Sequence, residues 1–172
     1  MEETQPKIGK FSLNYGLILG VIGVIFGVML YTMDAHTSRD SSNTIISLVM
    51  TAAVITWGIW AFRKANDGFL SIGQAVKLGA GIALISGIIS VIYTIFLAKY
   101  LDPEFITKIA EAGKAAAIED GRMSSAQIEQ QYEGTINMFW ISYPVILIFS
   151  IIIGLVIGLI DGLILKKAKP DY

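Results

Sequence analysis

The sequence contains no cysteine and only one histidine, His36. The absence of cysteine excludes disulfide bonds, thiolate metal sites and catalysis by a thiol. A zinc or haem site built on histidines is not expected either, since one histidine cannot supply the set of ligands. The chain also lacks a serine–histidine–aspartate set, a glycine-rich phosphate loop and paired ligands at metal-binding spacing. We therefore expect no catalytic residue, no metal and no cofactor.

Charge is scarce as well: charged residues make up 16% of the chain and hydrophobic residues 54%. A soluble domain carries about 25% charged residues, so this composition indicates a protein whose main partner is the lipid bilayer. The net charge of −1 gives no basis for binding nucleic acid, because such binding requires a concentrated basic surface.

Four long apolar runs account for the hydrophobic excess, at residues 11–33, 43–62, 74–97 and 140–165. A helix needs about 20 such residues to cross the hydrocarbon core of a bilayer. The first run could instead be a cleaved signal peptide, but it is longer than the apolar part of such peptides. The sequence thus predicts an all-α integral membrane protein, a single domain over residues 1–172 with four transmembrane helices.

The segment between the third and fourth runs is too long for a bare connection and carries helix signals of its own. Asp102, Pro103 and Glu104 match an N-cap, a proline at the first helical position and an acid in the first turn. Ser124 and Gln127 have the spacing of a capping box that opens a second helix. Apolar residues recur at helical spacing after both signals, so we expect a pair of amphipathic helices here.

Positive charge is distributed unevenly over the segments outside the runs. The N-terminus, the loop 63–77 and the C-terminus together hold eight Lys and Arg residues, whereas the loop 34–42 holds one. Cytoplasmic segments of membrane proteins carry the excess of these residues. We therefore expect a multi-pass protein of the bacterial inner membrane with both termini in the cytoplasm. The segment 98–139 and its amphipathic helices would then be extracytoplasmic.

The loop between the second and third runs contains a strong turn signal, Asn-Asp-Gly at 66–68, followed by Ser71 and Gln74 at capping-box spacing. The stretch Asn-Asp-Gly-Phe-Leu-Ser-Ile-Gly-Gln-Ala at 66–75, together with Asp-Pro-Glu-Phe at 102–105 and the four spans, resembles a bacterial membrane family. That family is catalogued as domain of unknown function 4199. The resemblance covers nearly the whole chain and implies an integral membrane protein with four helices. It implies no activity and no functional residue, because the family has none assigned.

Small residues form stripes at helical spacing on three of the runs. In a bilayer, helices associate by close approach of their backbones, so such stripes mark packing faces. Glycine is also common in membrane helices in general. The partner of each stripe could be another helix of the same chain or a second copy. The stripes are Gly16, Gly20, Gly23 and Gly27; Ala75, Gly79, Ala83 and Gly87; and Ser150, Gly154, Gly158 and Gly162.

Asp161 is the one acid clearly inside a run, about one turn from the expected cytoplasmic end of the fourth. A carboxylate within a membrane is a candidate for proton or cation coupling. Lys77 should lie at the same depth on the third run, so the two could instead form a structural ion pair. Lys166 and interfacial water could also relieve the charge. We favour a structural role because Asp161 lies at shallow depth.

The residues outside the small-residue stripes give little indication of a catalytic or binding function. The leading hypothesis is a small non-enzymatic membrane protein that acts through helix packing or through association, as a homo-oligomer or with another membrane protein. The alternative is a small ion-coupled transporter centred on Asp161 and Lys77, although no clear inverted repeat supports it. His36 is expected to be a solvated loop residue.

Overall fold

The structure is a computed structural model that describes residues 6–38 and 40–168. Its four long helices are α1 (Ile8–Thr32), α2 (Ser41–Ala65), α3 (Ile72–Phe96) and α6 (Ser142–Leu165). Each is long and apolar enough to cross a membrane. The predicted all-α class is confirmed, because helix accounts for 84% of the structure and the described residues contain no strand. Helix length and composition thus indicate a multi-pass membrane protein.

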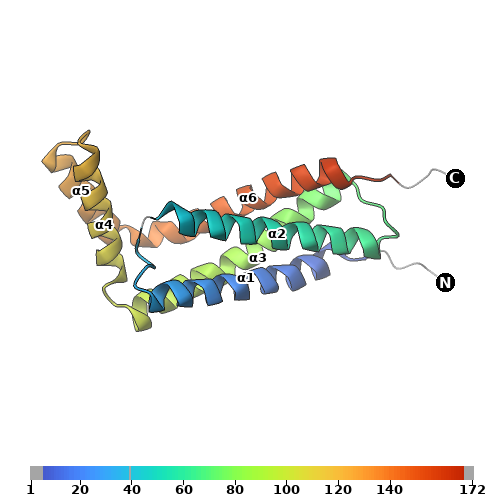
Figure 1. Ribbon diagram of the computed structural model, residues 1–172, viewed down its shortest axis with the longest axis horizontal. Helices are drawn as coiled ribbons and strands as arrows, with labels where there is room; N and C mark the ends of the chain where they lie inside the picture. The colour runs from blue at the N-terminus through green and yellow to red at the C-terminus, as the bar shows by residue number, and fades with distance from the viewer. Residues whose placement is uncertain (1–5, 39, 169–172) are drawn as a thin grey trace.

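The four long helices form an elongated bundle in which α3 is the central member (Figure 1). α3 makes its largest contacts with α6 and with α1, while α2 packs less extensively against the other three. The fully buried side chains include Ile55, Ile59, Leu78 and Ile82. These fully buried side chains of α2 and α3 lie toward the end of the bundle where α1 begins and α6 ends.

Two shorter helices, α4 (Phe105–Asp120) and α5 (Ser125–Asn137), separate α3 from α6. They pack against each other as a hairpin that lies across the end of the bundle (Figure 1), and we call this end the hairpin end. A π-helical turn, Leu97–Leu101, connects α3 to the hairpin, and a 3₁₀ turn, Phe139–Ile141, connects the hairpin to α6. Gly121 joins α4 to α5 with a φ of 67°, a value that glycine adopts without strain.

Both predicted capping boxes are present. The Ser71 hydroxyl accepts a hydrogen bond from the Gln74 N–H, and the Gln74 side chain accepts one from the Ser71 N–H. Ser124 and Gln127 make the same reciprocal pair at the start of α5. Each box satisfies two N–H groups that would otherwise have no partner in the first turn, which is why these two sequence signals locate the helix starts well.

The start of α4 differs from the prediction. Asp102 is not the N-cap of this helix, which begins three residues later at Phe105. The Asp102 carboxylate instead caps the preceding turn, where it accepts a hydrogen bond of 3.2 Å from the Glu104 N–H. The Asp-Pro-Glu motif therefore builds a tight turn at the base of the hairpin, and this turn positions the Asp102 side chain for contacts outside α4.

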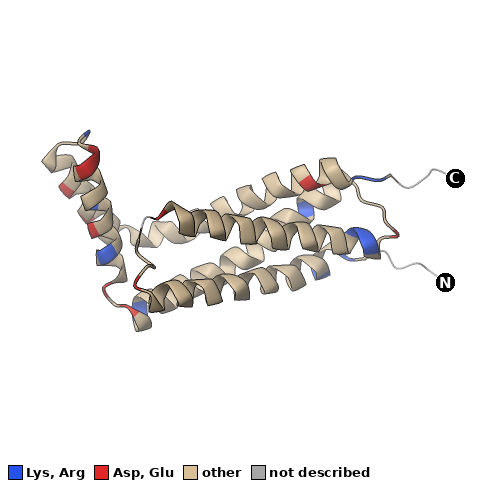
Figure 2. Ribbon diagram, in the orientation of Figure 1, with Lys and Arg blue, Asp and Glu red and all other residues tan. Residues whose placement is uncertain are grey.

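Charged residues gather toward the two ends of the molecule, and much of the bundle between them is free of charge (Figure 2). This distribution suits a protein whose middle lies in hydrocarbon, where an unpaired charge is costly. Arg39 and Lys169, which both count in the charge comparison above, lie outside the described residues.

Candidate functional site

The small-residue stripes of α3 and α6 face each other. A Cβ atom added to Gly158 would lie 2.6 Å from the carbonyl oxygen of Ala75 and 3.0 Å from the Cα of Val76. A Cβ added to Gly79 would meet the carbonyl oxygen of Gly154. The two backbones are therefore in direct contact, which is the geometry by which helices associate in a bilayer. Gly154 is equally close to the backbone of α3, whereas a Cβ on Gly87 would meet the Ser150 side chain and one on Gly162 would lie 3.1 Å from the Cβ of Ala75.

The stripe of α1 packs against the other side of α3. A Cβ on Gly16 would lie 2.6 Å from the Cβ of Ile85, and a Cβ on Gly20 would meet the Ile89 side chain. Gly23 is the exception, because a Cβ there would have no atom within 4 Å. Apart from Gly23, the stripes find their contacts within one chain, so these faces are not available to a second copy.

Asp161 and Lys77 are not paired in the structure. Asp161 is 7% exposed and its carboxylate faces Thr56 of α2. Lys77 is exposed, and its ammonium group forms no ion pair with any carboxylate of residues 6–38 or 40–168. The reason is rotational: Ala75 points at α6, and a helix turns about 200° over two residues, so Lys77 points away. Matching membrane depth is therefore not sufficient to form the pair.

We expect Asp161→Asn and Lys77→Gln to have additive effects on the free energy of unfolding, within about 0.5 kcal/mol, because the side chains do not contact each other. Lys77→Gln alone should change the stability by less than about 0.5 kcal/mol, as for other exposed positions. The measurement is a double-mutant cycle read by denaturant unfolding in detergent. A coupling energy above about 1 kcal/mol would show that the two residues interact.

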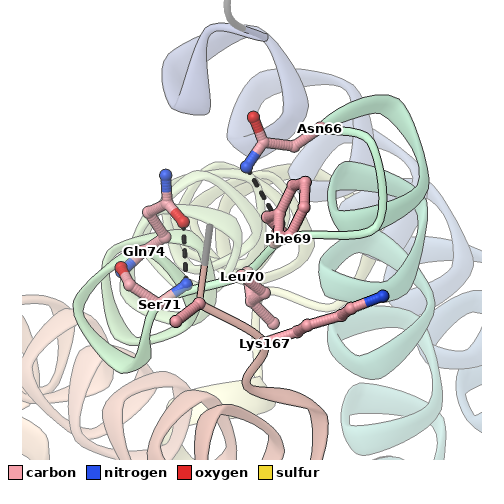
Figure 3. Close-up of a pocket in the computed structure, with 7 residues that line it drawn as sticks. Asn66, Phe69, Leu70, Ser71, Gln74 and Lys167 are labelled. Atoms are coloured by element: carbon pink, nitrogen blue, oxygen red, sulfur yellow. Dashed lines mark hydrogen bonds between the residues drawn. The ribbon is translucent and has the colours of Figure 1, made fainter. Parts of the chain in front are cut away.

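The loop that carries the Asn-Asp-Gly motif joins the start of α3 to the end of α6 (Figure 3). Leu70 and Lys167 exchange two backbone hydrogen bonds of 3.0 and 2.9 Å. The Asn66 amide donates to the carbonyl oxygen of Phe69 at 2.8 Å, and the Lys167 ammonium lies 5.5 Å from the centre of the Phe69 ring. These contacts surround a cavity of about 210 Å³. We call this arrangement the clasp, because it ties together two helices that meet along their glycine stripes.

A buried carboxylate at the hairpin end joins three separate segments. Asp102 is 6% exposed and accepts hydrogen bonds from His36 Nε2 at 2.9 Å and from Lys108 Nζ at 2.9 and 3.0 Å. The Lys108 ammonium holds the pKa of this carboxyl below its ordinary value; burial opposes that effect and His36 adds to it. The same contact raises the pKa of Lys108. We call His36, Asp102 and Lys108 the hairpin anchor, since they tie the α1–α2 loop to the base of α4.

The expectation that His36 is solvated is wrong. Its side chain is 7% exposed, and its ring stacks on Phe105 at 5.9 Å and meets Tyr31 edge-on at 5.2 Å. The Tyr31 hydroxyl in turn donates to the carbonyl oxygen of Leu101 at 2.9 Å. His36 and Asp102 are 66 positions apart in the sequence, so no local pattern could reveal the contact. The Asp-Pro-Glu-Phe motif gave the one available signal, since it marks the turn that holds Asp102.

The geometry of the hairpin anchor is structural rather than catalytic. A general base must come within about 3 Å of the proton that it removes from a substrate. His36 Nδ1 is buried and has no hydrogen-bond partner, and Tyr31 and Phe105 cover its ring. Among the described residues, no three His, Asp or Glu side chains come together to hold a metal ion. What the anchor can do is fix the position of the hairpin.

Apart from the start of α1 (Ile8–Thr32), the spans, the clasp and the hairpin anchor fall within the part of the chain that a family model matches. The family is described as a protein of unknown function (DUF4199), and the match covers residues 14–167. The chain belongs to this family. The resemblance found in the 66–75 and 102–105 stretches is thereby confirmed. No curated protein and no solved structure matches the chain. In this DUF4199 protein, the two motif stretches build the clasp and the base of the hairpin.

Proposed function

We propose that this DUF4199 protein is a non-enzymatic membrane protein that acts by association, with the α4–α5 hairpin as its docking surface. The hairpin anchor is the observation that carries this proposal, because a buried carboxylate with three partners fixes the hairpin at the bundle end. The glycine stripes already pack within the chain, with Gly23 the exception. The hairpin, which lies outside the four spans, is therefore the part of the molecule that we assign to a partner.

The hairpin is built to keep its shape. Ala110 and Gly113 of α4 and Ile128 of α5 are buried between the two helices. Lys114 makes an ion pair of 2.5 Å with Glu129, and its ammonium lies 5.0 Å from the centre of the Tyr132 ring. Preorganised surfaces bind with a smaller loss of conformational entropy than flexible ones. A hairpin stiffened in this way suits a docking role.

The surface chemistry of the hairpin favours a protein partner over a lipid surface. Segment 98–139 carries seven acidic and four basic residues, whereas helices that lie on anionic membranes have polar faces rich in Lys and Arg. Ile118, Met123 and Ile136 are exposed apolar side chains on the same hairpin. Exposed apolar side chains on a hairpin with an excess of acidic residues fit a partner that presents apolar and basic groups, and we infer that another membrane protein supplies it.

The expected result is that a photo-crosslinker placed at Ile118, which is 60% exposed, yields an adduct with one protein in cells. The matched control is the same crosslinker at the exposed Ala65, at the opposite end of the bundle. Ile118→Asp should weaken binding to that partner by about tenfold, as for an apolar side chain within an interface, with unchanged thermal stability. Adducts with lipid alone, or equal adducts at both positions, would contradict the docking role.

We further propose that the protein resides in a bacterial inner membrane with its termini and the clasp in the cytoplasm and the hairpin outside. The support is the excess of Lys and Arg in segments at one end of the bundle. The clasp and the hairpin lie at opposite ends (Figure 1), so a single orientation accounts for both.

Cysteine labelling tests this orientation directly, because the chain contains no cysteine of its own. Exposed positions at the two ends are Ser42 and Ser124 at the hairpin end and Ala65 near the clasp. Ala65 is more suitable than the neighbouring Asn66, because Asn66 is buried. An impermeant reagent applied to whole cells should label cysteines at 42 and 124 and leave one at 65 unlabelled. The reverse pattern would invert the topology.

A second candidate function, ion-coupled transport, is favoured by one observation. Asp161 Oδ2 is buried and has no hydrogen-bond partner, and such an orphaned group costs about 1–3 kcal/mol. Proteins retain that cost where the group serves a purpose, such as taking up a proton or a cation. Lys77 is not part of the proposed ion-coupling centre at Asp161, because its exposed side chain points away from α6. Loss of ion-dependent transport in Asp161→Asn at normal expression would favour this function over association.

A further inference from the structure

The half of α2 nearest the hairpin stands away from the rest of the bundle. The buried residues of α2 all lie within 54–62, whereas most of 41–50 is exposed. A groove of about 620 Å³ opens between α1 and α2, and a cavity of about 180 Å³ lies beside it inside the bundle. Ser47, Thr51 and Ile153 line both spaces, so the groove leads into the cavity.

Hydroxyl groups from three helices line the inner cavity: those of Ser47, Thr51, Ser86, Ser90 and Ser150. Thr51 and Ser150 donate to carbonyl oxygens of their own helices. The hydroxyls of Ser47, Ser86 and Ser90 donate to no acceptor within the described part of the chain. A hydroxyl group at membrane depth is costly without a partner. The cavity thus presents donors that a ligand can satisfy.

The glycines of α1 explain the shape of the groove. Gly23 and Gly27 line it together with Phe26 and Leu30. Gly23 is not needed for packing, since a Cβ there would have no atom within 4 Å. The missing side chain leaves room beside α2 instead. At about 620 Å³, the groove falls within the range of about 300–1,000 Å³ that is usual for small-molecule sites.

The cavity is closed toward the clasp. Ile55 lies one helical turn from Thr51 in the direction of the clasp, and Ile82 lies one turn from Ser86 in the same direction. Both isoleucines are fully buried. A site that opens through the groove between α1 and α2 and is closed toward the clasp is suited to holding a molecule rather than to conducting one. Among residues 6–38 and 40–168, no Asp, Glu, Lys or Arg lines the groove or the cavity. A charged head group would therefore be buried without a counter-charge, which is strongly unfavourable.

We propose that this site binds a neutral lipid of the diacylglycerol class. The hydroxyl of its head group enters the cavity, where Ser47, Ser86 and Ser90 bind it, and an acyl chain lies in the groove between α1 and α2. Lateral entry from the bilayer suits such a ligand, since its chain need not leave hydrocarbon. The site uses none of the residues of the hairpin anchor, so it is independent of the docking role.

The test is saturable binding of a fluorescent diacylglycerol to the full-length protein in detergent, with a fluorescent phosphatidylglycerol as the anionic comparison. Wild type should bind the diacylglycerol and not the anionic lipid. Removing two hydroxyls in the double variant Ser86→Ala, Ser90→Ala should weaken binding by about tenfold. Gly23→Leu should abolish binding by filling the groove, and the protein should still fold because Gly23 faces open space.

The matched control is Ser12→Ala, since Ser12 is buried against Gly81 and lines neither space. It should bind the probe as wild type does. Three results would each overturn the proposal: no saturable binding by wild type, equal affinity in the double serine variant, or equal affinity for the anionic lipid. The first of these would leave a cavity that holds water only.

Discussion

Gly158→Ala is expected to lower the free energy of unfolding by about 2–3 kcal/mol, although it adds only one methyl group. The new Cβ would lie 2.6 Å from the carbonyl oxygen of Ala75 and 3.0 Å from the Cα of Val76. Both atoms belong to the backbone of α3, which cannot rotate away as a side chain could. The helices must separate, and the contacts along their whole interface weaken together. Unfolding in mixed micelles at increasing denaturing detergent measures the effect.

Gly23→Ala is the matched control, since it makes the same chemical change on a helix of the same bundle. A Cβ at Gly23 would have no atom within 4 Å, so only the helix propensity changes. Alanine is favoured over glycine inside a helix by up to about 1 kcal/mol. The control should therefore be neutral or slightly more stable than wild type. Equal losses at Gly158 and Gly23 would show that the α3–α6 contact is not as close as described.

Asp102→Asn is expected to release the hairpin from the bundle. The substitution removes the charge that Lys108 and His36 share, and asparagine cannot accept from all the donors that surround the carboxylate. Removing one member of a buried pair costs about 3–5 kcal/mol. The Lys108 side chain is 41% exposed and can be rehydrated, so we expect a loss of about 2 kcal/mol. Limited proteolysis should show faster cleavage within residues 98–139.

The same residue predicts a dependence on pH. The pKa of Asp102 is lowered in the folded protein, so its contribution to stability is present above the unfolded value of about 3.9. That contribution is lost as the pH falls through the folded pKa. Proteolysis of the wild-type hairpin should therefore accelerate at acidic pH, and in Asp102→Asn it should be fast throughout. Asp120→Asn is the control, because Asp120 pairs with Arg122, which is exposed. An identical pH profile in Asp102→Asn and wild type would contradict the assignment.

The sequence predicted those features that depend on neighbours along the chain. Span length, the capping boxes at Ser71 and Ser124, and the turn at 66–68 are local, and each is present. The rotation of a helix about its axis depends on the whole bundle. For that reason depth alone suggested a partner for Asp161 that the structure does not provide. The small-residue stripes were the one sequence signal that indicated which face of each helix packs, because close contact between helix backbones requires small residues at the interface.

The sequence does not indicate the contacts between distant segments in this way. His36 and Asp102 meet because a loop folds back onto the base of the hairpin; the Asp-Pro-Glu-Phe motif marks the turn at Asp102, but nothing near His36 in the sequence indicates its partner. The serines and threonine that line the inner cavity are spread over α2, α3 and α6. They can be recognised as a group only after these helices are assembled. Prediction from one sequence therefore succeeded for local features and failed for these contacts between distant segments.

The clasp has a consequence for the order in which the bundle assembles. α6 is the last of the four spans to be synthesised, and its stripe supplies one side of the closest interface. α1 and α3 can dock as soon as α3 has entered the membrane, but the other side of α3 must wait for α6. The exchange between Leu70 and Lys167 then closes the bundle from its far end. Until that moment the glycine face of α3 lies open in the bilayer, and a neighbouring nascent chain could occupy it.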